Sequence, residues 1–224
     1  LFRKSAVVLA NSPDMERLAN AMGAKHVRRM GTSVARAFLE RPATEPQAET
    51  RHLLFAGRLA EEKNVPMIVD LARELPEVEV SIAGDGPLRD IVAQAADELP
   101  NLHYLGWVPR DELIDVIDRH DLMLLPSQVE SFGTVALEGM ARARPVVVSS
   151  TCGIADWPAL VPGLYCIGAD ESLSQAVARI RSLPEATRRE KSQLARQVAL
   201  DLNERNVTDW MQRLRGDIDT ELAA

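Results

Sequence analysis

The feature that most constrains the fold of this chain is a regular alternation of short apolar runs and helix-forming stretches from residue 52 onward. The expected strands are residues 52–56, 78–83, 102–105, 122–125, 145–149 and 164–167. The expected helices are residues 65–75, 88–98, 111–119, 133–143, 171–182, 185–200 and 207–222. Apolar strands that alternate with helices form a mainly parallel sheet, because each helix must cross over one face of the sheet. We therefore predict an α/β fold with helices on both faces.

The N-terminal part of the chain follows a different pattern. Residues 6–10 are typical of a strand, residues 14–22 of a helix and residues 27–30 of a second short strand. A segment rich in Pro, Glu and Thr follows, and its composition is typical of a linker. The resulting division is a βαβ unit over residues 1–41, a linker over 42–51, a larger α/β domain over 52–200 and a C-terminal helix over 201–224.

Charge and composition narrow the class of protein. The 224 residues carry a formal net charge of −7, which argues against a broad basic face and hence against nucleic acid as a partner. No apolar stretch reaches the roughly 18 residues that a membrane-spanning helix needs, so we expect no transmembrane segment. The two cysteines are too few for a disulfide scaffold, and the four histidines lack the spacing of metal ligands. We expect reduced thiols and no bound metal.

Residues 53–69, LLFAGRLAEEKNVPMIV, place two cations at a strand-to-helix turn. Arg58 follows the apolar strand, and Lys63 precedes a helix whose N-cap we expect to be Asn64, with Pro66 in its first turn. Arginine offers a planar fork of donors and lysine a compact charge, a combination that suits a diphosphate. Cations near a helix start are also common as ordinary solvated side chains. The pattern by itself leaves both interpretations open.

The segment LMLLPSQVESFGTVALEGMARARPVVVSS combines a strand, an acidic loop and a helix. The helix should open at Phe132, Gly133 and Thr134, where unpaired backbone N–H groups and the helix dipole favour a phosphate. We expect Gly133 to let the ligand approach the backbone, because it carries no side chain. Glu130 lies before this helix and Glu138 about five residues into it, roughly 7 Å further along the axis. The two carboxylates are placed to bracket a diphosphate, although a lone pair of glutamates is usually solvated.

Together and in this order, the two segments resemble the signatures of the retaining, nucleotide-sugar-dependent glycosyltransferases of the GT-B type, the family 4 or group 1 class. Members carry two glutamates separated by seven residues, and a Gly-Arg-Leu motif followed by Lys-Gly, where this chain has Asn64 in place of the glycine. The resemblance implies that Arg58 and Lys63 contact the donor diphosphate. It implies that Glu130 contacts the donor sugar and Glu138 the ribose hydroxyls, with Glu130, Arg58 and Lys63 as the catalytic group.

Two weaker motifs occur in the same order. Gly84 opens a Gly-Asp-Gly-Pro run after an apolar strand, which fits both a tight turn and a wall of the ligand site. Residues 106–109, Gly-Trp-Val-Pro, resemble the family's loop beneath the nucleobase, so the resemblance implies that the backbone near Val108 reads the base. We interpret Trp107 as a partly buried packing residue and Trp157 as part of the core.

The resemblance implies a Rossmann-like, donor-binding C-terminal half of a GT-B enzyme. It predicts transfer of a sugar from a nucleotide diphosphate sugar to an unknown acceptor (a glycan, lipid or small molecule), without a metal or other cofactor. Residues 1–41 would be the remnant of the acceptor-binding domain, and helix 201–224 would return to that domain. We expect this chain to bind the donor but to transfer nothing alone. The expected protein is cytoplasmic, with peripheral contact at the inner membrane face open through the missing domain.

Two alternatives to transfer remain open from the sequence. One is a nucleotide-sugar binding module without transfer activity. The other is a nucleotide-sugar epimerase on the same fold, which would need acid and base groups that the sequence does not reveal. A second Rossmann-like half upstream of Leu1 would favour the transferase. The sequence does not specify the donor sugar, its base or the acceptor.

Overall fold

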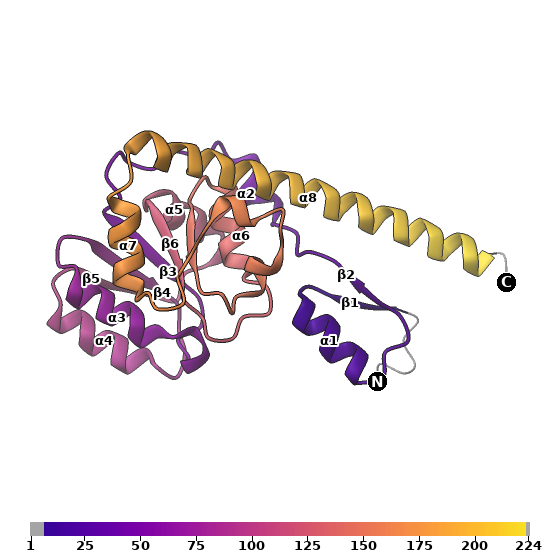
Figure 1. The fold of residues 1–224 in the computed structure, drawn as a ribbon, viewed down its shortest axis with the longest axis horizontal. Coiled ribbons are helices and arrows are strands. Elements are labelled where there is room, and N and C mark those ends of the chain that lie inside the picture. The colour runs from indigo at the N-terminus through magenta and orange to yellow at the C-terminus, as the bar shows by residue number, and fades with distance from the viewer. Residues whose placement is uncertain (1–6, 223–224) are drawn as a thin grey trace.

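The structure of the chain is a computed structural model that describes residues 7–222, with side chains over residues 7–212 (Figure 1). The strands are β1 (Val8–Ala10), β2 (Val27–Arg29), β3 (His52–Ala56), β4 (Glu79–Ala83), β5 (Leu102–Gly106), β6 (Leu122–Leu125), β7 (Val146–Val148) and β8 (Leu164–Cys166). The α-helices are α1 (Pro13–Ala21), α2 (Arg36–Glu40), α3 (Val65–Glu74), α4 (Arg89–Glu98), α5 (Arg110–Asp118), α6 (Thr134–Ala141), α7 (Leu173–Arg181) and α8 (Glu185–Leu222).

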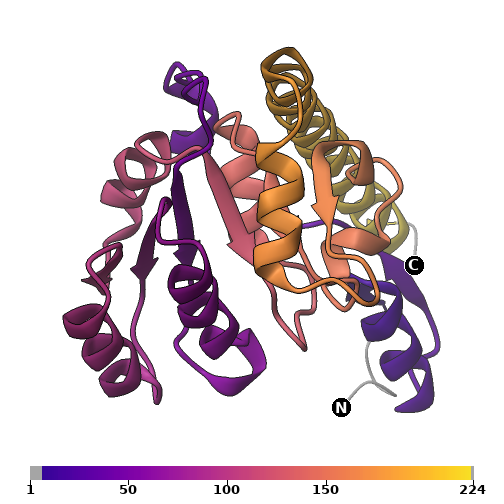
Figure 2. The ribbon, with the colours of Figure 1, turned by 60° about the vertical axis from the view of Figure 1, so that its left-hand side comes forward.

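The large sheet is parallel, and its strand order is β5-β4-β3-β6-β7-β8. The chain enters at β3 in the middle, winds outward to β5, and then crosses back to β6 and winds outward on the other side. This is the strand order of Rossmann-like folds, in which ligands bind where the winding reverses, beyond the carboxyl ends of the central strands. Figure 2 shows helices on both sides of the sheet. The predicted fold class is confirmed.

Each face of the sheet is covered by its own hydrophobic core. Leu53 and Phe55 of β3 pack with residues of α3, α4 and α7 on one face. Leu54 and Ala56 pack with residues of α5, α6 and α8 on the other face. This division follows from the alternation of side chains along a strand. Because both faces are buried, the central strands read as continuous apolar runs, which is why they stood out in the sequence.

The prediction of separate helices over residues 185–200 and 207–222 is wrong, because α8 runs unbroken from Glu185 to Leu222. The intervening sequence, DLNERN, contains neither Pro nor Gly, so nothing in it forces a break. Its asparagines bond elsewhere: the backbone N–H of Val34 donates to Asn203 Oδ1 at 3.0 Å, and Asn206 Nδ2 donates to the carbonyl of Thr32 at 3.1 Å. Within residues 7–222, no helix combines the length and apolar content required to cross a membrane.

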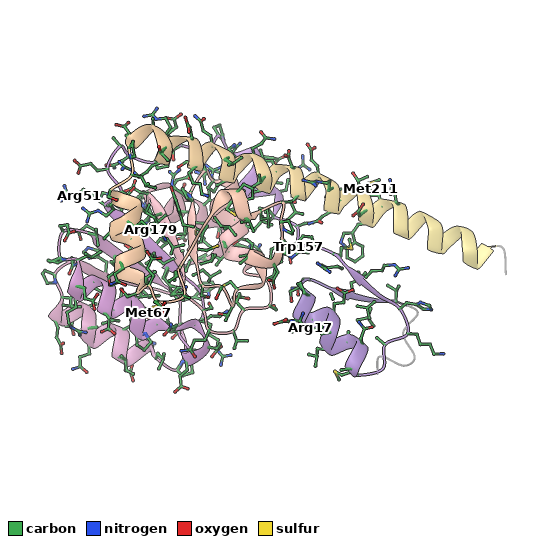
Figure 3. All side chains as sticks on the ribbon, viewed as in Figure 1. Arg17, Arg51, Met67, Trp157, Arg179 and Met211 are labelled. Atoms are coloured by element: carbon green, nitrogen blue, oxygen red, sulfur yellow. The ribbon has the colours of Figure 1, made fainter. Side chains whose placement is uncertain are left out.

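The N-terminal unit is a small parallel pair of strands, β1 and β2, with α1 packed on it. Ala6, the first residue of the predicted strand, lies outside the described residues. Figure 1 shows this unit apart from the large sheet and beside the C-terminal half of α8. In Figure 3, Trp157 lies on the side of the large domain that faces this unit, and its indole N–H donates to the carbonyl of Asn11 at 3.0 Å. Its ring meets Phe132 edge to face, which fits the predicted core role.

The predicted linker has no helix or strand between residues 42 and 51, yet it is fastened to the large domain. The buried guanidinium groups of Arg142 and Arg144 donate to the carbonyls of Pro42 at 2.7 Å and Thr44 at 2.5 Å. The short helix α2 precedes this segment. It was not predicted from the sequence, because its five residues are too few to show a helical period. The limits of the predicted domains stay predictions.

Candidate functional site

A pocket of about 540 Å³ lies where the winding of the sheet reverses, at the carboxyl ends of β3 and β4 and the starts of α5 and α6. Five of the predicted site residues line it: Arg58, Gly84, Val108, Thr134 and Glu138. The topology brings them together, because the carboxyl ends of parallel strands share one edge of a sheet. The other predicted residues lie outside its lining: Lys63, Glu130, Phe132 and Gly133.

The β3 side of the pocket combines a free cation with a close approach of two loops. Arg58 is exposed and forms no ion pair or side-chain hydrogen bond with any residue from 7 to 212. Beside it, a Cβ at Gly84 would stand 1.8 Å from the carbonyl oxygen of Gly57, and Gly84 has φ +144°. Both observations require glycine at position 84. This residue therefore serves the turn and also lines the pocket. Its role as a wall of the ligand site stays a prediction.

Lys63 and Glu130 form an ion pair at the neighbouring loops after β3 and β6, and both side chains are largely shielded from water. Asn64, next to Lys63, has φ 55° and ψ 40°. Asparagine is the residue that most readily replaces glycine in this left-handed region. Asn64 therefore adopts a backbone conformation that glycine would also allow. Asn64 is the N-cap residue of α3 as predicted, but its side chain does not cap the helix and instead donates to Met67 Sδ at 3.5 Å.

Glu130 borders a second hollow, between its own loop and the start of α1 in the N-terminal unit. Ser12, Asp14 and Arg17 lie on the α1 side of this hollow. A hydrogen bond fixes the backbone of Glu130, since its carbonyl accepts from the N–H of Gly153 at 2.8 Å. A ligand that extends from the first pocket past Lys63 would therefore meet Glu130 and the N-terminal unit.

Glu138 is the shielded carboxylate of the first pocket. It lies in the second turn of α6 with its side chain 6% exposed, and it forms an ion pair with Arg110, the first residue of α5. Burial raises the pKa of Glu138, and the charge and hydrogen bond of Arg110 oppose that rise. Arg110 was not among the residues predicted from the sequence to form the site. Its position could have indicated a role, because a cation at the first residue of a helix lies at the positive end of the helix dipole and needs an anionic partner.

The first turn of α6 presents backbone donors to the pocket. The N–H groups of Thr134 and Val135 donate to no acceptor within the described part of the chain. Gly133 precedes them with φ +91°, and a Cβ there would stand 2.7 Å from Leu125 Cδ2. The backbone turn and the packing on Leu125 therefore already require glycine at this position. Close approach of a ligand to Gly133 stays a prediction. Phe132 is buried against Trp157, outside the pocket.

The interpretation of Trp107 as a packing residue is wrong, because its side chain is 71% exposed. β5 is the edge strand of the sheet, and the loop that follows it leaves the indole exposed. The indole lies at the wall of the first pocket beside Val108. An exposed aromatic ring at a pocket wall is a surface on which a planar ring can stack.

Comparison with known families assigns the chain. The family described as "Glycosyl transferases group 1" matches residues 38–196, which is most of the chain. The chain belongs to this family. Group 1 membership confirms the resemblance seen in the sequence, and the matched region contains the first pocket, Lys63 and Glu130.

Curated relatives of this group 1 chain include a glycogen synthase of Mycobacterium tuberculosis, 32% identical over 166 residues that make up 69% of the chain and 39% of the relative. A GDP-mannose-dependent α-(1-6)-phosphatidylinositol dimannoside mannosyltransferase of the same organism is 32% identical over 142 residues, 61% of the chain and 37% of the relative. The chain thus spans well under half the length of these relatives.

Solved structures share its GT-B fold. Sucrose-phosphate synthase from Thermosynechococcus elongatus superposes with a TM-score of 0.77 at 21% identity, covering 98% of the chain and 60% of that protein. Anabaena HepE in complex with UDP superposes with a TM-score of 0.74 at 17% identity, covering 98% of the chain and 65% of that protein. At these identities the likeness concerns the fold.

Proposed function

We propose that this chain binds a nucleoside diphosphate sugar as the donor-binding part of a retaining glycosyltransferase. The observation that carries the proposal is the pocket where the sheet reverses: a free cation, unpaired helix N–H groups and a shielded carboxylate converge on it. The first two suit a diphosphate, and a carboxylate suits the neighbouring hydroxyls of a ribose. Group 1 membership supports sugar transfer as the reaction.

The proposal gives each part of the donor its own place along the pocket. The nucleobase lies near Val108 and the exposed ring of Trp107, and the ribose lies over Glu138. The diphosphate then meets Arg58 and the first turn of α6. The sugar extends past Lys63 toward Glu130 and the hollow beside α1, which is the side from which an acceptor hydroxyl would approach.

The chemistry of the proposed reaction is mainly electrostatic. The bond between the anomeric carbon and the diphosphate oxygen breaks, and the anomeric carbon forms a new bond to the acceptor oxygen with retention of configuration. Negative charge grows on the departing diphosphate, and the acceptor hydroxyl gives its proton to an oxygen of that diphosphate. Arg58, Lys63 and the N–H groups at the start of α6 stabilise that charge without needing to reorganise. For this, Lys63 must exchange Glu130 for the diphosphate, which frees Glu130 to accept hydroxyls of the sugar.

The roles of the two glutamates predict different responses to Glu→Gln substitution. Glu138→Gln should weaken a nucleoside diphosphate and its sugar conjugate equally, by about 1.5–3 kcal/mol each, because ribose is present in both. Glu130→Gln should weaken the sugar conjugate alone, because only the conjugate carries the sugar. Calorimetric titration of both variants with UDP, UDP-glucose, GDP and GDP-mannose measures these effects.

Two results would contradict these assignments. If Glu130→Gln weakened the nucleoside diphosphate as much as the sugar conjugate, the sugar role of Glu130 would be wrong. If Glu138→Gln left the nucleoside diphosphate unaffected, the ribose would not lie where the proposal places it. Glu79→Gln is a matched control, because Glu79 is a half-exposed glutamate that is paired with His103 and lies outside the first pocket.

We also propose that donor binding requires no divalent metal. Arg58, Lys63 and the helix N–H groups would neutralise the charge of the phosphates. The described residues contain no group of three or more His, Cys, Asp or Glu side chains placed to hold a metal. Nucleoside diphosphate affinity should therefore change by less than threefold, about 0.7 kcal/mol, when a chelator replaces Mg²⁺. Isothermal titration in the two buffers measures this, and a loss above tenfold would refute metal independence.

A further inference from the structure

The carboxylate of Glu138 depends on one neighbour for its charge balance. The charged residues that line the pocket with it are Arg58, Asp85 and Arg110. Of these, only Arg110 bonds to Glu138, through Nη2 to Oε1, and no other charged residue lies on α6. Oε2 accepts from no side chain or backbone group within residues 7–212. Arg110 thus holds one oxygen of the carboxylate and leaves the other free.

We propose that Arg110 is a positioning residue for the donor, which holds the carboxylate of Glu138 so that its free oxygen accepts the ribose hydroxyls. This inference rests on the proposed function and adds a residue that the group 1 motifs in this sequence do not include. Arg110 is suited to the role because its own side chain is 63% exposed at the pocket wall, whereas the side chain of Glu138 is 6% exposed. The cation can therefore reach the buried carboxylate without itself losing much hydration.

The physical consequence of losing Arg110 is a change of protonation. Burial raises the pKa of Glu138, and Arg110 is the group that lowers it. Without Arg110 the raised pKa moves higher still. Below that pKa the carboxyl group is neutral and becomes a poorer acceptor for two hydroxyls. Ribose binding should then fail as pH decreases, and it should fail at a higher pH than in the wild type.

An ordinary helix-surface ion pair would behave differently. Such a pair contributes little to stability, and its loss would leave ligand binding unchanged or would weaken it equally at every pH. The pH profile of nucleoside diphosphate binding therefore separates positioning from a merely structural contact. Arg110→Lys keeps a cation at the same place, and it should retain most of the wild-type profile.

The experiment compares the wild type with Arg110→Ala, Arg110→Lys and Arg89→Ala between pH 5.5 and 8.5. Arg89 is a matched control, since it is the exposed first residue of the neighbouring helix α4 and lies outside the pocket. Binding of UDP, GDP and ADP is titrated by calorimetry in each case. The phosphate of the ligand also takes up a proton over this pH range. This effect is the same for every variant, so it cancels in the ratio of variant to wild-type affinity at each pH. Circular dichroism confirms that each variant is folded.

We expect Arg110→Ala to bind within about threefold of wild type at pH 8.5 and to be weaker by about tenfold at pH 6, because without the cation the pKa of Glu138 rises further and the protonated carboxyl group is a poorer acceptor. Arg110→Lys and Arg89→Ala should stay within about threefold of wild type throughout. In the double variant Arg110→Ala with Glu138→Gln, the ratio of its affinity to that of the wild type should no longer fall as pH decreases, because the carboxyl group that takes up the proton is absent.

The outcomes separate this inference from the proposed function. A ratio near one at every pH, or a loss independent of pH, overturns the positioning role of Arg110. If Glu138→Gln still weakens binding in that case, the proposed function stands and the inference alone fails. If Glu138→Gln leaves binding unaffected, the ribose does not lie over Glu138 and the inference fails, while donor binding itself stands. If none of the three nucleoside diphosphates binds the wild type, the proposed function fails and the inference fails with it.

Discussion

Replacing Arg142 by alanine is expected to lower the free energy of unfolding by about 3–5 kcal/mol, the cost of leaving a buried charge unpaired. The guanidinium of Arg142 is fully buried and binds the carboxylate of Asp118 at 2.9 and 2.5 Å. It also donates to the carbonyls of Arg41 at 2.5 Å and Pro42 at 2.7 Å. The substitution leaves Asp118 without this partner and removes the fastening of the linker.

Urea unfolding followed by circular dichroism measures this loss. Arg189→Ala is the matched control, because Arg189 forms exposed ion pairs with Glu45 at 2.9 Å and Glu185 at 3.1 Å. Exposed pairs contribute about 0–1 kcal/mol, so the control should remain close to wild type. Equal destabilisation of the two variants would show that burial of Arg142 carries no special weight. Arg142→Met, which restores apolar volume without the charge, should still be destabilised, since Asp118 loses the same partner.

Replacing Arg58 or Lys63, the two cations proposed to bind phosphate, by alanine is expected to weaken nucleoside diphosphate binding by about 1.5–3 kcal/mol, provided that the charge-assisted bonds are shielded from water. The loss should be larger for Arg58→Ala. Arg58 has no competing partner among residues 7–212, whereas Lys63 must first leave Glu130. For the same reason, Glu130→Gln should leave nucleoside diphosphate affinity unchanged or increased.

The comparison of the nucleoside with its diphosphate tests whether the cations act on phosphate. Titration of each variant with uridine and UDP, and with guanosine and GDP, should show the loss for the diphosphates only. Arg73→Ala is a suitable control, because Arg73 is exposed on α3 and paired with Asp70 at 2.8 Å. An equal loss for nucleoside and diphosphate would remove Arg58 and Lys63 from the phosphate site.

Local sequence patterns determined the elements of the large domain and part of its site. The strands were readable because both faces of the sheet are buried, which makes each central strand an apolar run of its own. Arg58 and Thr134 were predicted to lie together because one follows a strand and the other opens a helix, and those positions converge in any parallel sheet of this order. Glu138 lies one turn further along the same helix as Thr134. In these cases the physical cause acts over a few residues.

Tertiary structure decided what depends on residues far apart in the chain. Arg110 and Glu138 are separated by 28 residues, and the bond between them exists only because α5 and α6 both begin at the pocket. Trp107 is exposed because β5 became the edge of the sheet. The linker is fastened because the guanidinium of Arg142 is buried away from water and donates to the carbonyl of Pro42, 100 residues earlier in the chain. Composition and periodicity report the local preferences of a segment, whereas burial and partner choice are set when distant segments meet.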